Sequence, residues 1–156
     1  MKKFISLLTV CMLVCSLTVN SFATDVTENY YVTTHVMSAE ETFEMFSTKA
    51  MTKTGSVLLR QNTSGTQGVA CGMFTADEES VSFRFTSAPT AKTYNIILHE
   101  GDEYNQGSQV VAPSEDVPIN NGTSFYDLTV GSTYYFIVSS DDVSEAVTAK
   151  YEIKTF

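Results

Sequence analysis

Residues 128–138 read LTVGSTYYFIV, and this run decides the fold class. A glycine turn at Gly131 leads into a strand whose two alternating faces are both apolar. One face carries Tyr134, Phe136 and Val138, and the other carries Tyr135 and Ile137. Successive side chains of a strand point to opposite sides of a sheet. The run therefore predicts a central strand that is covered on both faces.

Three further segments, residues 81–85, 94–98 and 147–153, alternate apolar and polar side chains as half-buried strands do. Turn-forming residues separate these segments, and Thr54-Gly55 is one such predicted turn. Helical periodicity is scarce. We therefore predict an all-β protein, an antiparallel β-sandwich of immunoglobulin/fibronectin-like or jelly-roll-like type.

One segment, residues 38–47, carries two conflicting signals. Ser38 and Glu41 fit a capping box, which begins a helix. Against this, Phe43 and Met45 alternate with polar neighbours, and the threonines that follow favour β structure. We interpret the segment as a strand.

The first 23 residues predict an export signal that is cleaved after Ala23. Lys2 and Lys3 precede an apolar stretch over residues 4–19, which is shorter than a membrane span requires. We expect residues 24–156 to form a single secreted domain without stable membrane insertion. Residues 25–28 are the one plausible linker. Cys71 is the only cysteine after the signal, so no disulfide within the chain is expected.

The run at 128–138 resembles the tyrosine-corner segment of fibronectin type III domains, over a match that extends from Ser56 to Phe156. The resemblance implies that Tyr134 packs its ring in the core and returns its hydroxyl to the backbone near the turn. Val130 stands where these domains often have proline. Phe83 would replace their usual tryptophan, because this chain has none.

The same region also resembles the pre-peptidase C-terminal domains of secreted bacterial peptidases. In those domains, too, a glycine turn leads into a Tyr-Tyr-aromatic strand, and a closing strand like Lys150-Tyr151-Glu152-Ile153 follows. Both resemblances imply a binding or accessory role and not catalysis.

Catalytic candidates are few in this sequence. Cys71 and His99 could pair as thiolate and base, but Val69, Cys71 and Met73 alternate as a core-facing set does. His99 falls on the polar side of its strand, which predicts an exposed edge histidine. No nucleophile elbow, phosphate-binding loop or zinc motif is present in the sequence. We expect a protein that is not an enzyme.

The formal net charge is −9, which disfavours nucleic acid and anionic membranes as partners. Acidic turns are the best candidate for a metal site, because calcium accepts several oxygen ligands in irregular geometry. The predicted calcium ligands are Glu100, Asp102, Glu103, Asp141 and Asp142. We otherwise predict no cofactor.

Tyr104 is the tyrosine that we expect to be exposed and available to a ligand, since its ring offers apolar area and its hydroxyl a hydrogen bond. The sequence thus predicts a secreted binding or adhesion module for an extracellular glycan or protein. The alternatives are a protease inhibitor that uses loops 62–68 or 100–107, a surface-assembly subunit that adds strands at an edge, and, less favoured, a hydrolase.

Overall fold

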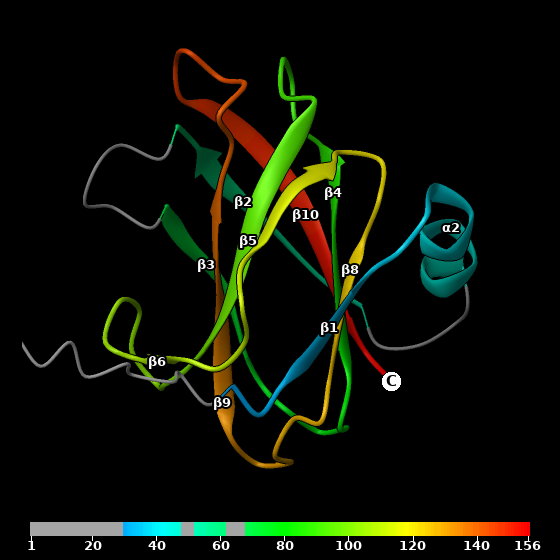
Figure 1. Cartoon of the computed structure of the whole chain (residues 1–156), viewed down its shortest axis with the longest axis vertical. Helices are drawn as coiled ribbons and strands as arrows, with labels where there is room; N and C mark the ends of the chain where they lie inside the picture. Colours follow the sequence, from blue (N-terminus) through cyan, green and yellow to red (C-terminus); the bar gives the residue numbers. More distant parts are fainter. Residues whose placement is uncertain (1–29, 48–51, 62–67) are drawn as a thin grey trace, which may run out of the picture.

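The computed structural model describes residues 30–47, 52–61 and 68–156. They form two antiparallel sheets that pack face to face, with one helix beside the first sheet (Figure 1). The predicted antiparallel β-sandwich is therefore confirmed. Within the described residues, no helix is long and apolar enough to cross a membrane. The predicted signal at 1–23 and the linker at 25–28 lie outside the described residues.

Sheet I has the strand order β1-β8-β4-β10-β2. Its strands are β1 (Thr33–Val36), β8 (Thr123–Tyr126), β4 (Val81–Ser87), β10 (Val147–Thr155) and β2 (Thr52–Leu59). The long closing strand β10 lies between β4 and β2 and pairs with both. The outer strands β1 and β2 are the two edges of this sheet.

Sheet II has the order β3-β9-β5-β6, and β7 also pairs with β5. Its strands are β3 (Val69–Thr75), β9 (Thr133–Ser139), β5 (Thr93–Glu100), β6 (Ser108–Gln109) and β7 (Ser114–Pro118). The strand that we predicted as central, β9, indeed lies between β3 and β5. Its two faces are both buried, as the sequence predicted.

Aromatic rings from both sheets fill the space between them. Phe83, which has no exposed surface, lies at the middle of this cluster. Its ring centroid is 5.0 Å from that of Phe136, 5.1 Å from Phe85 and 5.4 Å from Tyr151. Burial of large aromatic rings supplies much of the free energy that holds the two sheets together.

Tyr134 has the contacts that a corner tyrosine should have. Its ring is fully buried, and its hydroxyl accepts a hydrogen bond of 3.0 Å from the backbone N–H of Thr129. The bond fixes the turn at residues 129–132 against the strand that follows it. Membership of either resembled family stays a prediction.

Residues 39–47 are a helix, α2 (Ala39–Ser47), so our interpretation of this segment as a strand was wrong. The capping box decides the outcome: the N–H of Glu41 donates to the Ser38 hydroxyl (3.2 Å), and the N–H of Ser38 donates to the Glu41 carboxylate (2.7 Å). Thr42 is buried against sheet I, whereas the Phe43 side chain is 65% exposed. The alternation in the sequence therefore indicated the wrong direction for the Phe43 side chain.

The predicted turn at Thr54-Gly55 was also wrong, because both residues lie inside β2. Gly55 pairs with Tyr151 of β10, and the phenol ring of Tyr151 occupies the space that a Cβ at position 55 would need. Glycine here makes room for a ring and does not begin a turn.

Candidate functional site

The two groups of predicted calcium ligands lie at opposite ends of β5. Glu100 pairs with Tyr134, while Asn95 pairs with Ser139, just before Asp141 and Asp142. The eight residues of β5 span about 23 Å at ~3.3 Å per residue. The structure therefore does not bring Glu100, Asp102 and Glu103 together with Asp141 and Asp142.

Most of these carboxylates have a local hydrogen-bond partner. Tyr31 donates to Glu100, and Gln106 donates to Glu103. Asn95 donates to Asp141 (3.2 Å). Asp142 accepts from both the N–H and the hydroxyl of Thr93, each at 2.8 Å. Across the described residues, no three His, Cys, Asp or Glu side chains gather in a way that could hold a metal ion. Calcium binding stays a prediction.

The two bonds from Thr93 lower the pKa of the Asp142 carboxyl below its usual value, because both donors stabilise the charged form. They also join the loop after β9 to the start of β5. Asp142 thus has a structural role without any metal.

Tyr104 is 44% exposed, as predicted. Its ring stands edge-on to Tyr135, with the centroids 5.5 Å apart, and its hydroxyl accepts a hydrogen bond of 3.2 Å from the N–H of Met73. The segment 101–107 is thereby held over the outer face of sheet II. The Tyr104 side chain is therefore partly exposed, but its hydroxyl is already used.

Cys71 and His99 lie on opposite faces of sheet II. Cys71 pairs with the core residue Phe136, and His99 pairs with the outer-face residue Tyr135. Burial raises the pKa of the Cys71 thiol to about 12, so the thiolate is scarce at neutral pH. The structure does not bring this thiol and this imidazole together as a catalytic pair.

His99 is only 6% exposed, so our prediction of an exposed histidine was wrong. Segment 101–107 covers it, and its Nδ1 lies 3.2 Å from the carbonyl oxygen of Gly107. Its Nε2 is buried with no hydrogen-bond partner among the described residues. Burial lowers the pKa of the imidazole, because the charged form loses its hydration.

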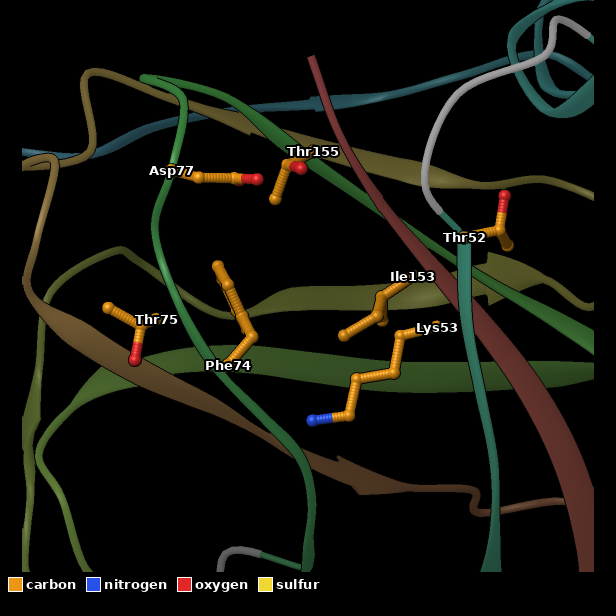
Figure 2. Close-up of a pocket in the computed structure, with 7 residues that line it drawn as sticks. All are labelled: Thr52, Lys53, Phe74, Thr75, Asp77, Ile153 and Thr155. Atoms are coloured by element: carbon orange, nitrogen blue, oxygen red, sulfur yellow. The ribbon is translucent and has the colours of Figure 1, made fainter.

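A cleft of about 250 Å³ opens between the two sheets, and sequence reasoning missed it. The side chains that line it come from β2, β3, β10 and the turn after β3 (Figure 2). They are Thr52, Lys53, Phe74, Thr75, Asp77, Ile153 and Thr155. Phe74 and Ile153 form its apolar wall, with Lys53 and Asp77 at its rim.

A β-bulge in β3 explains how Phe74 reaches this cleft. The pairing with β9 shifts between Cys71 and Phe74, and Gly72 adopts a positive φ of 65°, which glycine tolerates best. The extra residue returns Phe74 to the inner face and turns Met73 outward, against our prediction that Met73 shares a face with Cys71. A strict two-residue period along β3 could not predict the bulge or the outward direction of Met73.

The comparisons with known proteins give no further guide: no family model, no curated protein and no solved structure matches this chain.

Proposed function

We propose that this chain is a non-enzymatic binding module that acts outside the cell and recognises an extracellular protein or glycan. The cleft between β2, β3 and β10 is the observation that carries the proposal. Its volume of about 250 Å³ lies below the ~300–1,000 Å³ typical of sites for whole small-molecule ligands. It suits one part of a larger ligand, such as a side chain or a single sugar ring.

The lining favours a protein ligand over a glycan. Phe74 is 8% exposed and Ile153 only 2%, so neither offers the broad aromatic platform on which sugar faces stack. The two residues do offer an apolar wall to an aliphatic or small aromatic side chain. Asp77 at the rim can fix the orientation of the ligand backbone through polar contacts. The Lys53 ammonium donates to the Met73 carbonyl oxygen and has two further N–H donors for a ligand.

Location outside the cell is supported by the charge and hydropathy pattern of residues 1–23. A role without catalysis is supported by the separation of Cys71 from His99 across sheet II. The strong overall negative charge, −9, adds a preference for ligands that are not acidic.

The test is retention of extracellular matrix proteins and glycans on the immobilised chain, repeated with a variant of the cleft. Lys53→Met keeps most of the side-chain volume and removes the rim charge together with its hydrogen bond to the Met73 carbonyl oxygen, so the variant must first match the parent chain in its free energy of unfolding. Lys150→Met is the matched control, because Lys150 is exposed on β10 and does not line the cleft. We expect a retained protein whose affinity falls about threefold or more in Lys53→Met alone. Equal retention by both variants, or no retained ligand, would refute the proposal.

A further inference from the structure

A second cavity, of about 530 Å³, lies between α2 and the outer face of sheet I. We call it the helix pocket. It is lined by His35, Met37, Glu41, Glu44, Met45 and Tyr126. None of these residues lines the cleft described above, so the two sites are separate.

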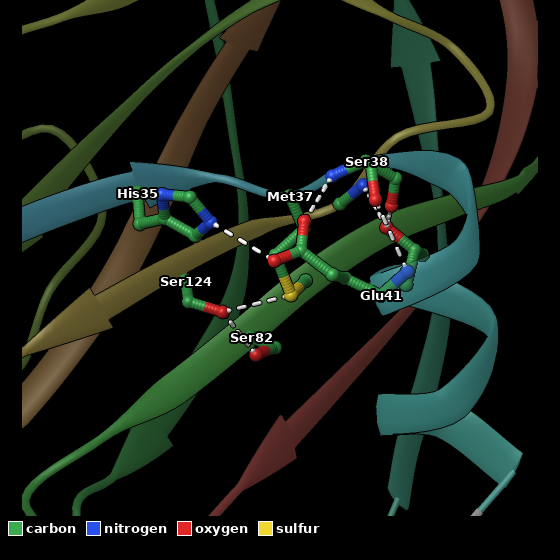
Figure 3. A network of polar contacts seen from close by, with 8 residues as sticks. His35, Met37, Ser38, Glu41, Ser82 and Ser124 are labelled. Carbon is green, nitrogen blue, oxygen red and sulfur yellow. Dashed lines mark hydrogen bonds and ion pairs between the residues drawn. The ribbon is translucent and has the colours of Figure 1, made fainter.

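Hydrogen bonds hold the first turn of α2 and the strands beneath it in place (Figure 3). The N–H of Met37 donates to the carbonyl oxygen of Gly122 (2.8 Å), and the N–H of Gly122 donates to the Thr42 hydroxyl (2.6 Å). The hydroxyl of Ser124 donates to the Met37 sulfur at 3.1 Å. The wall of the pocket is therefore built before any ligand arrives, which reduces the entropy cost of binding.

The end of the helix is anchored as well. The guanidinium of Arg84 lies 4.3 Å from the ring centroid of Phe46, and its ion pair with Glu152 is 2.6 Å long. The buried ammonium of Lys154 donates to the carbonyl oxygen of Met45. Both ends of α2 are thus fixed to sheet I.

The charged groups of the pocket favour a cation. Glu41 and Glu44 are both on its wall, and the described lining includes no Lys or Arg. Hydrogen bonds from the N–H and hydroxyl of Ser38 lower the pKa of the Glu41 carboxyl, which keeps it ionised. The nearest basic side chain on the wall, His35, is 53% exposed at 3.7 Å from Glu41, a loose pair that contributes little.

The remaining lining is apolar and polarisable. Met45 is half-buried and presents a thioether side chain, which adapts to the shape of an aliphatic chain. Met37 is 3% exposed, and its sulfur already accepts from Ser124. The Tyr126 ring is held by an edge contact with Phe156, with the centroids 6.0 Å apart. A ligand that fills this pocket should combine a carbon stem with one positive charge.

We infer that the helix pocket receives a lysine side chain of a partner protein. The four-carbon stem would pack against Met45 and Tyr126, and the ammonium would meet the carboxylates of Glu41 and Glu44. At Glu41 lysine fits better than arginine, because the Glu41 Oε2 atom already accepts from Ser38. Glu41 thus lacks the two free oxygens that a guanidinium needs for a bidentate contact.

The inference can be tested with a short peptide probe and the ¹⁵N-labelled chain. The probe is acetyl-Gly-Lys-Gly-amide, and its uncharged match replaces lysine with norleucine. We expect the lysine peptide to shift the amide signals of residues 35–45 and Tyr126 at millimolar concentration, and the norleucine peptide to bind at least about threefold more weakly.

Variants of α2 distinguish a specific contact with Glu44 from a general electrostatic attraction to this acidic chain. Glu44→Gln should weaken the lysine peptide about threefold, whereas Glu40→Gln, which removes the same charge from the same helix outside the lining, should not. Glu44 is the better target because the Glu41 carboxylate also caps the helix by accepting from the Ser38 N–H. Equal binding of both peptides, equal effects of both variants, or tighter binding of tetramethylammonium than of the lysine peptide would overturn the inference.

Discussion

The hydroxyl of Tyr104 accepts a hydrogen bond from the backbone N–H of Met73, at 3.2 Å and across 31 residues of sequence. Met73 lies at the bulge of β3, an edge strand of sheet II. Its carbonyl oxygen accepts from the ammonium of Lys53. Side chains from two other segments therefore satisfy both backbone groups of Met73, which blunts this edge against pairing with another chain.

Tyr104→Phe should lower the free energy of unfolding by about 0.5–1 kcal/mol, because it removes one neutral hydrogen bond and keeps the ring on Tyr135. Hydrogen exchange at the Met73 amide should become faster, and chemical denaturation measures the loss in stability. Tyr126→Phe is a control with the same chemical change at another tyrosine. Unchanged exchange at Met73 would contradict the role assigned to this hydroxyl.

Because the His99 imidazole is buried, we predict that the folded chain loses stability in mild acid. Its pKa is lowered from the ordinary value of 6.5 in the folded chain, so the unfolded chain takes up a proton first as the pH falls. The stability that neutral His99 provides is present above pH 6.5 and is lost as the pH falls toward the lower, folded pKa. The Tyr135 ring and the Gly107 carbonyl are its described contacts.

Urea unfolding at pH 7.5 and pH 5.5 measures this effect. His99→Gln should show a smaller difference between the two pH values than the parent chain shows. The exposed His35 offers a matched control, since His35→Gln leaves the buried imidazole in place. A pH dependence that survives in His99→Gln would assign the effect to other groups.

The calcium prediction requires that millimolar calcium raise the melting temperature through one loop alone, because the two acidic groups lie at opposite ends of β5. A site filled at ten times its Kd would add about 1.4 kcal/mol and raise the melting temperature by at least ~3 °C. Differential scanning fluorimetry with calcium and with chelator decides the question. A rise that Asp142→Asn or Asp102→Asn abolishes would confirm the calcium prediction for that loop, and an unchanged melting temperature would refute it.

Cys71 should resist thiol reagents in the folded chain. A pKa of about 12 leaves about one thiolate in 10,000 thiols at pH 8, and the side chain is only 5% exposed. A chromogenic disulfide reagent should react within seconds in denaturant and hardly at all in native buffer. Rapid reaction of the native chain would show that β3 opens readily at its edge.

The strands were predictable because their signal is local. The two-residue alternation in residues 81–85, 94–98 and 134–138 reports directly on which side chains point inward, and all three segments are strands. The corner contact of Tyr134 could be anticipated for the same reason, because Thr129 lies only five residues away. Residues 38–47 contained the correct helix signal as well, because the capping box is present in the sequence. The alternation of Phe43 and Met45 was wrongly given more weight than this capping box.

The cleft and the helix pocket could not be predicted from the sequence in this way. The cleft joins side chains from β2, β3 and β10, and Phe74 reaches it only through the bulge at Gly72. The burial of His99 likewise depends on segment 101–107 folding back over sheet II. Such arrangements depend on how distant segments meet, which periodicity along one segment does not contain.

The residues that evolution can place at positions 55 and 151 depend on each other sterically. The ring of Tyr151 occupies the place of the side chain that Gly55 lacks, so neither position can change freely while the other stays. Substitution of Gly55 alone forces the tip of the Tyr151 ring to move, and loss of the ring alone leaves a void beside the glycine. In descendants of this sequence the two positions should therefore vary together, with glycine retained opposite an aromatic ring and larger residues admitted only where that ring has been lost.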